Sequence, residues 1–276
     1  MKLKSLAAVV AGALSLVALD ASACSTAAWI QDGGTSGVVG APIAAQPNST
    51  PTAVARYAGL CGLQSSAANN FVRDGSPTAE ATFRARFYVR ADAGDGKLVF
   101  RARNASNADM VTVTYNAAGF SFTTSGGTAS SAAVTPGRWY SIELNWAAGA
   151  AMTATVQGNG AAAALPTVTL PGVSNAADRI DFAELGWISG GTGSAVQVDA
   201  YESRRTTAIG RLCRGNANIT GPSANTRDVF DIQTMVNEIN AVSLSPGQPD
   251  FSEDGSVNVL DIQGVVNAIN TSPACT

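Results

Sequence analysis

Short alternating runs of apolar and polar residues fill the chain from about residue 24 to residue 210. The segment 83–89 (FRARFYV) places every second side chain on one apolar face, and the alternation resumes at 98–102 after a turn at 92–96. We interpret these two segments as a hairpin. Further strands are predicted at residues 111–115, 120–123, 139–146, 152–157, 167–170, 182–187 and 196–202. Because many short strands occur without a helix-forming pattern, we expect an antiparallel β-sandwich here.

Three stretches of this region resemble the concanavalin-A-like, laminin-G-like jelly-roll family. They are 137–146 (GRWYSIELNW), 181–186 (DFAELG) and 198–203 (VDAYES). The resemblance covers most of residues 50–210. It implies a fold of two sheets that is often used to bind glycans.

The pattern changes after Gly210, where two copies of one unit occur. Residues 228–240 (DVFDIQTMVNEIN) and 258–270 (NVLDIQGVVNAIN) align without gaps. Each copy carries apolar residues at helical spacing, namely Ile232, Met235, Val236 and Ile239 in the first and Ile262, Val265, Val266 and Ile269 in the second. We therefore predict two amphipathic helices whose apolar stripes bury each other.

An oxygen-rich segment of twelve residues, 250–261 (DFSEDGSVNVLD), precedes and enters the second helix. Calcium takes six to eight oxygen ligands, and Gly255 stands at the sixth position of the loop, where an EF-hand-like chain turns sharply. Glu253 points away from the ion by the same count. The predicted ligands are Asp250, Ser252, Asp254, Ser256 through its carbonyl, Asn258 and Asp261. The alternative is an ordinary turn rich in Asp and Asn.

The loop before the first helix departs from this pattern. Four extra residues intervene after Gly221, and the loop offers two carboxylates in place of three. Its candidate ligands are Asn216, Asn218, Thr220, Asp228 and Asp231. We expect a weaker calcium site, and whether it is occupied stays open.

The duplicated loop and helix resemble a type I dockerin over residues 213–275, with Asp where an EF-hand has Glu at position 12. Dockerins dock onto cohesin modules, and the residues just before the position-12 Asp contact and recognise the cohesin. The resemblance implies that the contacts here are Val229, Phe230, Val259 and Leu260. The alternative is that these side chains pack against the sandwich or each other.

The composition excludes several classes of catalytic site and of binding partner. The chain has 276 residues, a formal net charge of -3, 13% charged residues and no His. The absence of His excludes Ser-His-Asp and Cys-His nucleophiles and His-ligated catalytic metals. The nearly neutral charge gives no basic surface for a nucleic acid backbone, so no nucleic acid partner is expected.

The N-terminus has the pattern of an export signal. Lys2 and Lys4 precede an apolar run at 5–19 and a small-residue cleavage site at 21–23. Fifteen or so apolar residues are short for a membrane anchor, so we expect no membrane span after cleavage. Cys24 directly after the cut leaves lipidation as an alternative. The predicted organisation is a signal peptide at 1–23, a sandwich at 24–210 and a dockerin-like module at 211–276 of a secreted protein.

Four Cys in an exported chain favour two disulfides. Three pairings are open. Position favours Cys24 with Cys61 and Cys213 with Cys275, because the second bond closes the C-terminal segment into one covalent loop. Such a clasp suits a module with a small core.

The segment 179–184 (RIDFAE) resembles the strand on which laminarinase-type glucanases carry the motif E-x-D-x-x-E. Arg179 stands where the nucleophilic Glu belongs, so a retaining glycosidase mechanism is not expected here. Asp181 and Glu184 are expected to have structural roles. A divergent polysaccharide-degrading glycoside hydrolase remains the alternative, and a structural surface protein is a third.

The predicted hairpin places like charges opposite each other on its outer face. Such an arrangement is unfavourable unless something neutralises it. Glu143 and Glu202 are candidates for that role, and an anionic glycan or surface polymer is the other. The arginines concerned are Arg84, Arg86, Arg101 and Arg103. The sequence thus predicts a mainly β, non-catalytic protein, with a lectin-like jelly roll followed by a small α-helical module that binds calcium.

Overall fold

A computed structural model describes most of the chain beyond residue 55. The described residues are 42–44, 56–59, 61–91, 94–131, 133–158, 167–220, 225–240, 242–272 and 274–275. The predicted signal peptide and Cys24 lie outside them, so the proposed bond from Cys24 to Cys61 stays a prediction.

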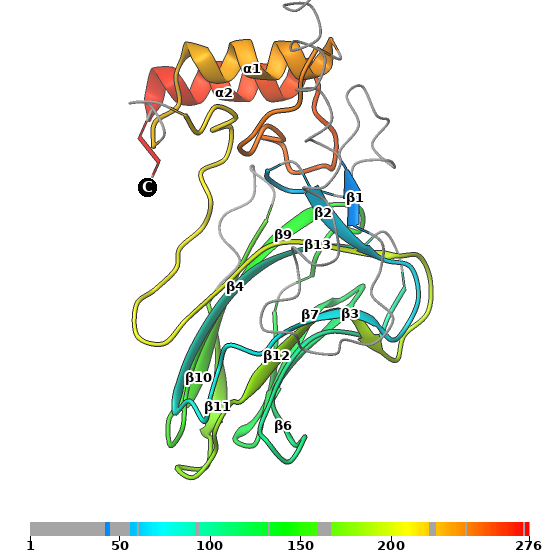
Figure 1. Ribbon diagram of the computed structural model, residues 1–276, viewed down its shortest axis with the longest axis vertical. Helices are drawn as coiled ribbons and strands as arrows, with labels where there is room; N and C mark the ends of the chain where they lie inside the picture. Colours follow the sequence, from blue (N-terminus) through cyan, green and yellow to red (C-terminus); the bar gives the residue numbers. More distant parts are fainter. Residues whose placement is uncertain are drawn as a thin grey trace, which may run out of the picture.

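The described strands form two antiparallel sheets, as predicted for a sandwich (Figure 1). The first sheet has the order β1 (Pro42–Ala44), β2 (Cys61–Ser65), β13 (Val196–Arg204), β4 (Thr82–Ala91), β9 (Trp139–Ala147), β10 (Ala151–Gly158) and β11 (Val168–Val173). The second has the order β3 (Asn70–Asp74), β12 (Phe182–Ser189), β5 (Lys97–Arg103), β6 (Asp109–Asn116), β7 (Gly119–Thr124) and β8 (Gly127–Ser130). Each strand predicted between residues 83 and 202 is present, with ends that differ by a few residues.

The main core lies between the two sheets. Phe87 of β4 and Phe100 of β5 stack across it, with ring centroids 4.8 Å apart. Trp146 and Met152 are also buried in this core. Truncating a buried Phe to Ala costs about 3–5 kcal/mol in such a site, so each of these rings contributes substantially to the stability of the sandwich.

The predicted hairpin of 83–89 with 98–102 was wrong. β4 pairs with β9 and β13, whereas β5 pairs with β6 and β12 in the other sheet. An alternating pattern shows which face of a strand is buried, but it does not show which strand lies beside it. Two consecutive strands that face one core from opposite sheets carry the same pattern as a hairpin.

The C-terminal part contains two helices that lie side by side at one end of the sandwich, α1 (Val229–Ile239) and α2 (Val259–Thr271) (Figure 1). Met235 and Val265 are buried between them, in one cluster with Ala217. This confirms that the apolar stripes pack together. The predicted disulfide Cys213–Cys275 is present and closes the segment. Neither helix is long and apolar enough to cross a membrane, and the other described residues contain no such helix.

Candidate functional site

Residues 250–261 form a closed turn in which two carboxylates accept backbone N–H groups. Asp250 accepts from Asp254 at 3.2 Å and from Gly255 at 2.8 Å. Asp261 accepts from Ser252 and Asn258, each at 2.8 Å. Gly255 has a φ of +89°, a left-handed conformation that favours glycine and that explains its place at the sharp turn.

Two of the carboxyl groups in this turn are buried. Asp250 and Asp261 are 4% and 0% exposed. Burial raises the pKa of both carboxyl groups, and the charge of Asp261 raises that of Asp250 further. Two buried carboxylates are unfavourable in their charged form, because they lose hydration and repel each other. A bound cation would stabilise that charged form.

The other predicted ligands continue this cluster. The Ser256 hydroxyl donates to Asp254 at 2.8 Å, and the Ser252 hydroxyl donates to Asp250 at 3.3 Å. In the described part of the chain, no three His, Cys, Asp or Glu side chains are placed to hold a metal by themselves. An ion at this turn therefore needs the Ser and Asn oxygens and a backbone carbonyl as well, which is how mixed oxygen sites for calcium are built.

The first loop repeats the two hydrogen bonds that the last carboxylate of the second loop accepts. Asp231 accepts from the N–H of Asn218 at 2.7 Å and of Asp228 at 2.8 Å, as Asp261 does from Ser252 and Asn258. Each helix begins with the same capping box, formed by Asp228 with Asp231 and by Asn258 with Asp261. The duplication seen in the sequence is thus a duplication of structure. Thr220 bonds to Asn218, and residues 221–224 lie outside the described chain.

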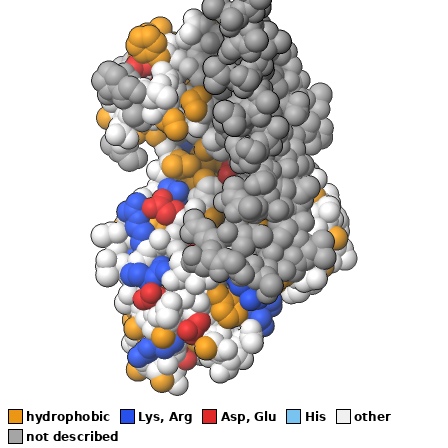
Figure 2. All heavy atoms as spheres, viewed as in Figure 1, with side chains coloured by type: hydrophobic (Ala, Val, Ile, Leu, Met, Phe, Trp, Pro, Cys, Tyr) orange, Lys and Arg blue, Asp and Glu red, His pale blue; other side chains and the backbone are white. Residues whose placement is uncertain are grey.

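The two apolar pairs predicted to contact a partner are exposed. Val229 and Phe230 at the start of α1 are 65% and 59% exposed, and Val259 and Leu260 at the start of α2 are 70% and 69% exposed. The alternative that these side chains are buried against the sandwich or each other was therefore wrong. Hydrophobic side chains are visible on the surface of the helical part, at the top of Figure 2. Each helix therefore begins with two large apolar side chains that are open to solvent.

The four arginines of the supposed hairpin do not form one cluster. Arg84 and Arg86 lie on the first sheet, and Arg101 and Arg103 lie on the second. Arg86 is buried and pairs with Glu202 at 3.2 Å, which confirms the predicted neutralisation by a neighbouring Glu. Glu143 instead accepts the backbone N–H groups of Ile209 and Gly210.

Glu184 and Asp181 have the structural roles that were expected. Glu184 is 1% exposed and shared between the guanidinium groups of Arg73 and Arg101. Asp181 accepts the backbone N–H groups of Ala79 and Ala105, at 3.0 and 2.8 Å.

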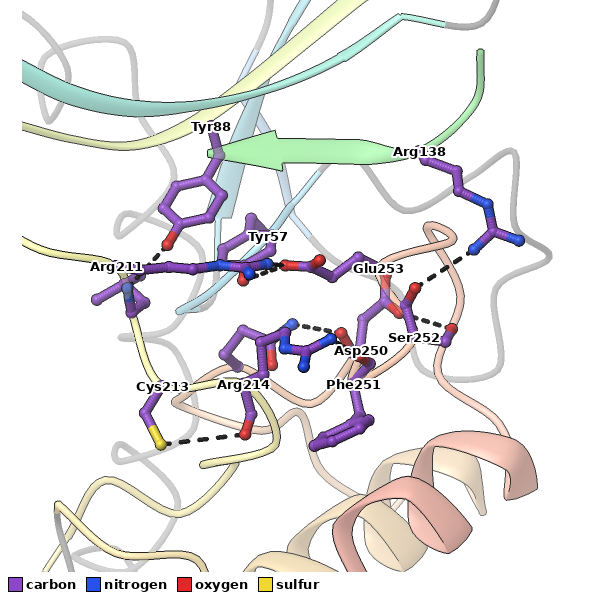
Figure 3. Close-up of polar contacts among 12 residues, drawn as sticks. Tyr57, Tyr88, Arg138, Arg211, Cys213, Arg214, Asp250, Phe251, Ser252 and Glu253 are labelled. Atoms are coloured by element: carbon purple, nitrogen blue, oxygen red, sulfur yellow. Dashed lines mark hydrogen bonds and ion pairs between the residues drawn. The ribbon is translucent and has the colours of Figure 1, made fainter. Parts of the chain in front are cut away.

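A buried cluster between the first sheet and the second loop was not predicted. Tyr57 stacks on Tyr88 of β4 with ring centroids 3.7 Å apart, and it meets the edge of Trp139 of β9. The Tyr57 hydroxyl donates to Glu253 at 2.7 Å, and Arg211 forms an ion pair with the same carboxylate (Figure 3). Burial and then the charge of Glu253 raise the pKa of Tyr57 well above its usual value, so the hydroxyl keeps the proton it donates.

Asp199 of β13 anchors the same segment from the other side. Its carboxylate accepts the backbone N–H groups of Tyr57, Ala58 and Ala200. It also lines a cavity of about 720 Å³ between the sandwich and the C-terminal part, together with Arg86 and Glu202. No sequence pattern marks Tyr57, Asp199 or Arg211, because their contacts join segments that are far apart in the chain.

Comparison with known proteins finds only distant structural likeness. No family model and no curated protein matches the chain. Among solved structures, it is similar to the cellulose-induced protein Cip1, at 12% identity and a TM-score of 0.42, over 63% of this chain and 90% of that one. An endo-β-1,4-glucuronan lyase from the fungus Trichoderma reesei matches at 12% identity and 0.39, over 60% and 87%. Domains LG4-5 of the mouse laminin α1 chain match at 16% and 0.34, over 49% and 40%. Likeness at this level supports no inference about activity.

Asp199 should make the stability of the protein depend on pH. Burial, although opposed by three N–H groups, raises the pKa of Asp199 from 3.8 to about 7. Between these values the folded protein holds a proton that the unfolded chain has released, so the free energy of unfolding should fall as pH rises from 4 to 7, by on the order of 4 kcal/mol. The Asp199→Asn variant lacks this contribution. Urea unfolding of both proteins at several pH values should show a difference that changes with pH, and parallel curves would contradict the assignment.

Proposed function

We propose that this is an exported, non-catalytic attachment protein. In this proposal the C-terminal part binds calcium and docks onto a cohesin-like protein module, while the β-sandwich binds an anionic polysaccharide. The observation that carries the proposal is the repeated loop and helix, in which both copies place an exposed apolar pair directly before a carboxylate that accepts the same two backbone hydrogen bonds.

Calcium fits the second loop by the chemistry of its donors. The loop brings hard oxygen ligands and three acidic side chains into one partly buried turn, and a divalent cation would offset their mutual repulsion. Asp250, Ser252, Asp254, Ser256, Asn258 and Asp261 would hold the ion. Bound calcium supplies a fixed positive centre, and it orders the loop from which α2 begins.

The exposed pairs give the module its surface for a partner. The core between the helices is built on Met235 and Val265, with half-buried isoleucines around them, and the exposed pairs are not part of it. Val229, Phe230, Val259 and Leu260 therefore remain free for a partner. A protein surface with apolar pockets matches them best.

Calcium should raise the thermal midpoint of the wild-type chain relative to a sample with EGTA. A ligand at 100 times its dissociation constant stabilises a folded protein by about 2.7 kcal/mol. The Asp261→Asn variant keeps the shape of the side chain but loses a charged ligand, so its response should be much smaller. Differential scanning calorimetry measures both. The matched change in the first loop, Asp231→Asn, should leave most of the response intact, and a wild-type midpoint that calcium does not move would refute the site.

Changing the exposed pairs should abolish partner binding without unfolding the module. A Phe230→Asp, Leu260→Asp double variant places a charge in each apolar pair, which opposes burial at an interface. Surface plasmon resonance with an immobilised type I cohesin and calcium should show loss of binding. Val242 is also exposed, at 71%, but it does not stand at a helix start, so Val242→Asp is the control. Equal binding by the double variant and the control would contradict the assignment.

The second sheet offers the sandwich's glycan surface. Side chains of one cross-strand row lie on its outer face, in the register Arg73, Glu184, Arg101, Thr112, Thr123, Thr128. Arg73 and Arg101 are partly exposed, and the single carboxylate between them neutralises only one guanidinium. Guanidinium groups bind carboxylates through two parallel hydrogen bonds, and threonine hydroxyls bond to sugar hydroxyls. This row therefore suits a chain of uronic acid residues.

Removing the charges of this row together should abolish binding to a polyuronate. We expect the triple variant Arg73→Gln, Arg101→Gln, Glu184→Gln to bind at least tenfold more weakly, because Gln at 184 avoids leaving a buried carboxylate without a partner. The control is Arg84→Gln, which removes an arginine from the other sheet. Affinity electrophoresis in gels with and without polyuronate distinguishes the two. Retained binding by the triple variant, or equal loss in the control, would show that the row is not the site.

A further inference from the structure

Glu253 interrupts the run of predicted calcium ligands in the second loop. It lies between Ser252 and Asp254, its side chain is 0% exposed, and it points away from the loop toward the sandwich (Figure 3). Its φ of +58° is a left-handed conformation that a residue with a Cβ adopts at a cost. Something in the surroundings must hold the backbone in this shape.

The sandwich and the linker after it provide what holds this shape. Tyr57 and Arg211 both bind the Glu253 carboxylate, as described above. The backbone carbonyl of Glu253 accepts the N–H of Trp139 at 3.0 Å, and the carbonyl of Ser252 accepts from Arg138 at 3.3 Å. Both side chain and main chain of this part of the loop are thus tied to groups outside it.

The surface under the loop is preorganised. Tyr57 is fixed by its stacking on Tyr88 and by the acceptance of its N–H by Asp199, and the Tyr88 hydroxyl accepts the N–H of Leu212 at 2.8 Å. Gly255 completes the fit, since a Cβ at this position would lie 2.6 Å from Nε of Arg90. The first sheet and the turn therefore have complementary surfaces.

Ser252 and Asp254, two of the predicted ligands, flank Glu253, and the backbone conformation between them is the one that places Glu253 against Tyr57 and Arg211. We propose that calcium binding in the second loop and docking of that loop on the sandwich are coupled through Glu253. This inference rests on the proposed calcium site. Calcium fixes the turn that presents Glu253, and the docked carboxylate preorganises the turn for calcium. By thermodynamic linkage each event strengthens the other by the same factor.

The test measures calcium affinity after changes made outside the loop. Tyr57→Phe removes one hydroxyl that lies far from the predicted ligands in sequence and contacts none of them, and isothermal titration of the full chain should show at least fivefold weaker calcium binding. Tyr140→Phe is the matched control, because it removes a hydroxyl on β9 that bonds to the N–H of Thr135 and not to the loop. Its calcium affinity should equal that of the wild type.

Two changes at position 253 separate the contact from the backbone strain. Glu253→Ala loses the contact and keeps a Cβ at positive φ, whereas Glu253→Gly loses the contact and adopts this φ freely. Calcium affinity should fall in both and should fall further in the Ala variant. Hydrogen exchange at the Trp139 N–H should slow on addition of calcium to the wild type.

The outcomes are distinguishable. Wild-type affinity in Tyr57→Phe and in both variants at position 253, with unchanged exchange at Trp139, would overturn the coupling while leaving the calcium site in place. A wild-type chain that binds no calcium would remove the site itself and the coupling with it. Circular dichroism checks that each variant is folded. A lower calcium affinity supports the coupling only in a variant whose spectrum matches that of the wild type.

Discussion

The buried carboxylate of Glu253 joins the two parts of this protein. A charge that is taken out of water is stable only if it is paired and hydrogen-bonded, and removing one partner of such a group costs several kcal/mol. Here the partners are Tyr57 and Arg211, from segments far from the loop in sequence. The geometry of the loop and the position of the C-terminal part therefore depend on the same contact.

The segment 56–59 extends this connection. The backbone N–H groups of Tyr57 and Ala58 bind Asp199 on β13, and Arg56 forms a buried ion pair with Glu238 on α1. Gly59 donates to the carbonyl of Gly247, ahead of the second loop. One short stretch between β1 and β2 thus contacts the first sheet, a helix and a loop. The boundary predicted at residues 210 and 211 remains a prediction, but the two sides of it share a buried polar interface rather than a bare linker.

Local patterns in the sequence predicted both helices and nine of the strands, but not β1, β2, β3 or β8. Alternation in 83–89 and helical spacing in 258–270 each indicate a buried face, and the turn glycine of the twelve-residue loop has the left-handed φ expected of it. What failed was the pairing of 83–89 with 98–102, because alternation contains no information on the neighbouring strand. The contacts of Glu253, Asp199 and Arg211 were not predicted, for the same physical reason. They depend on which distant segments meet, and no alternation, spacing or motif in a single sequence marks such groups.

Each of the repeated loops has an inward face and an outward face with different side chains. Their carboxylates turn inward, to the N–H groups that shape each turn, while the apolar pairs at the start of each helix turn outward to solvent. A cation held by the inward face would steady the helix starts from which the outward face projects. An anomalous difference map from crystals grown with calcium tests this arrangement most directly. We expect a peak in the second loop about 2.3–2.6 Å from a mixed set of carboxylate, hydroxyl, amide and carbonyl oxygens of residues 250–261. A turn with the carboxylates in place but no peak among them at saturating calcium would contradict it.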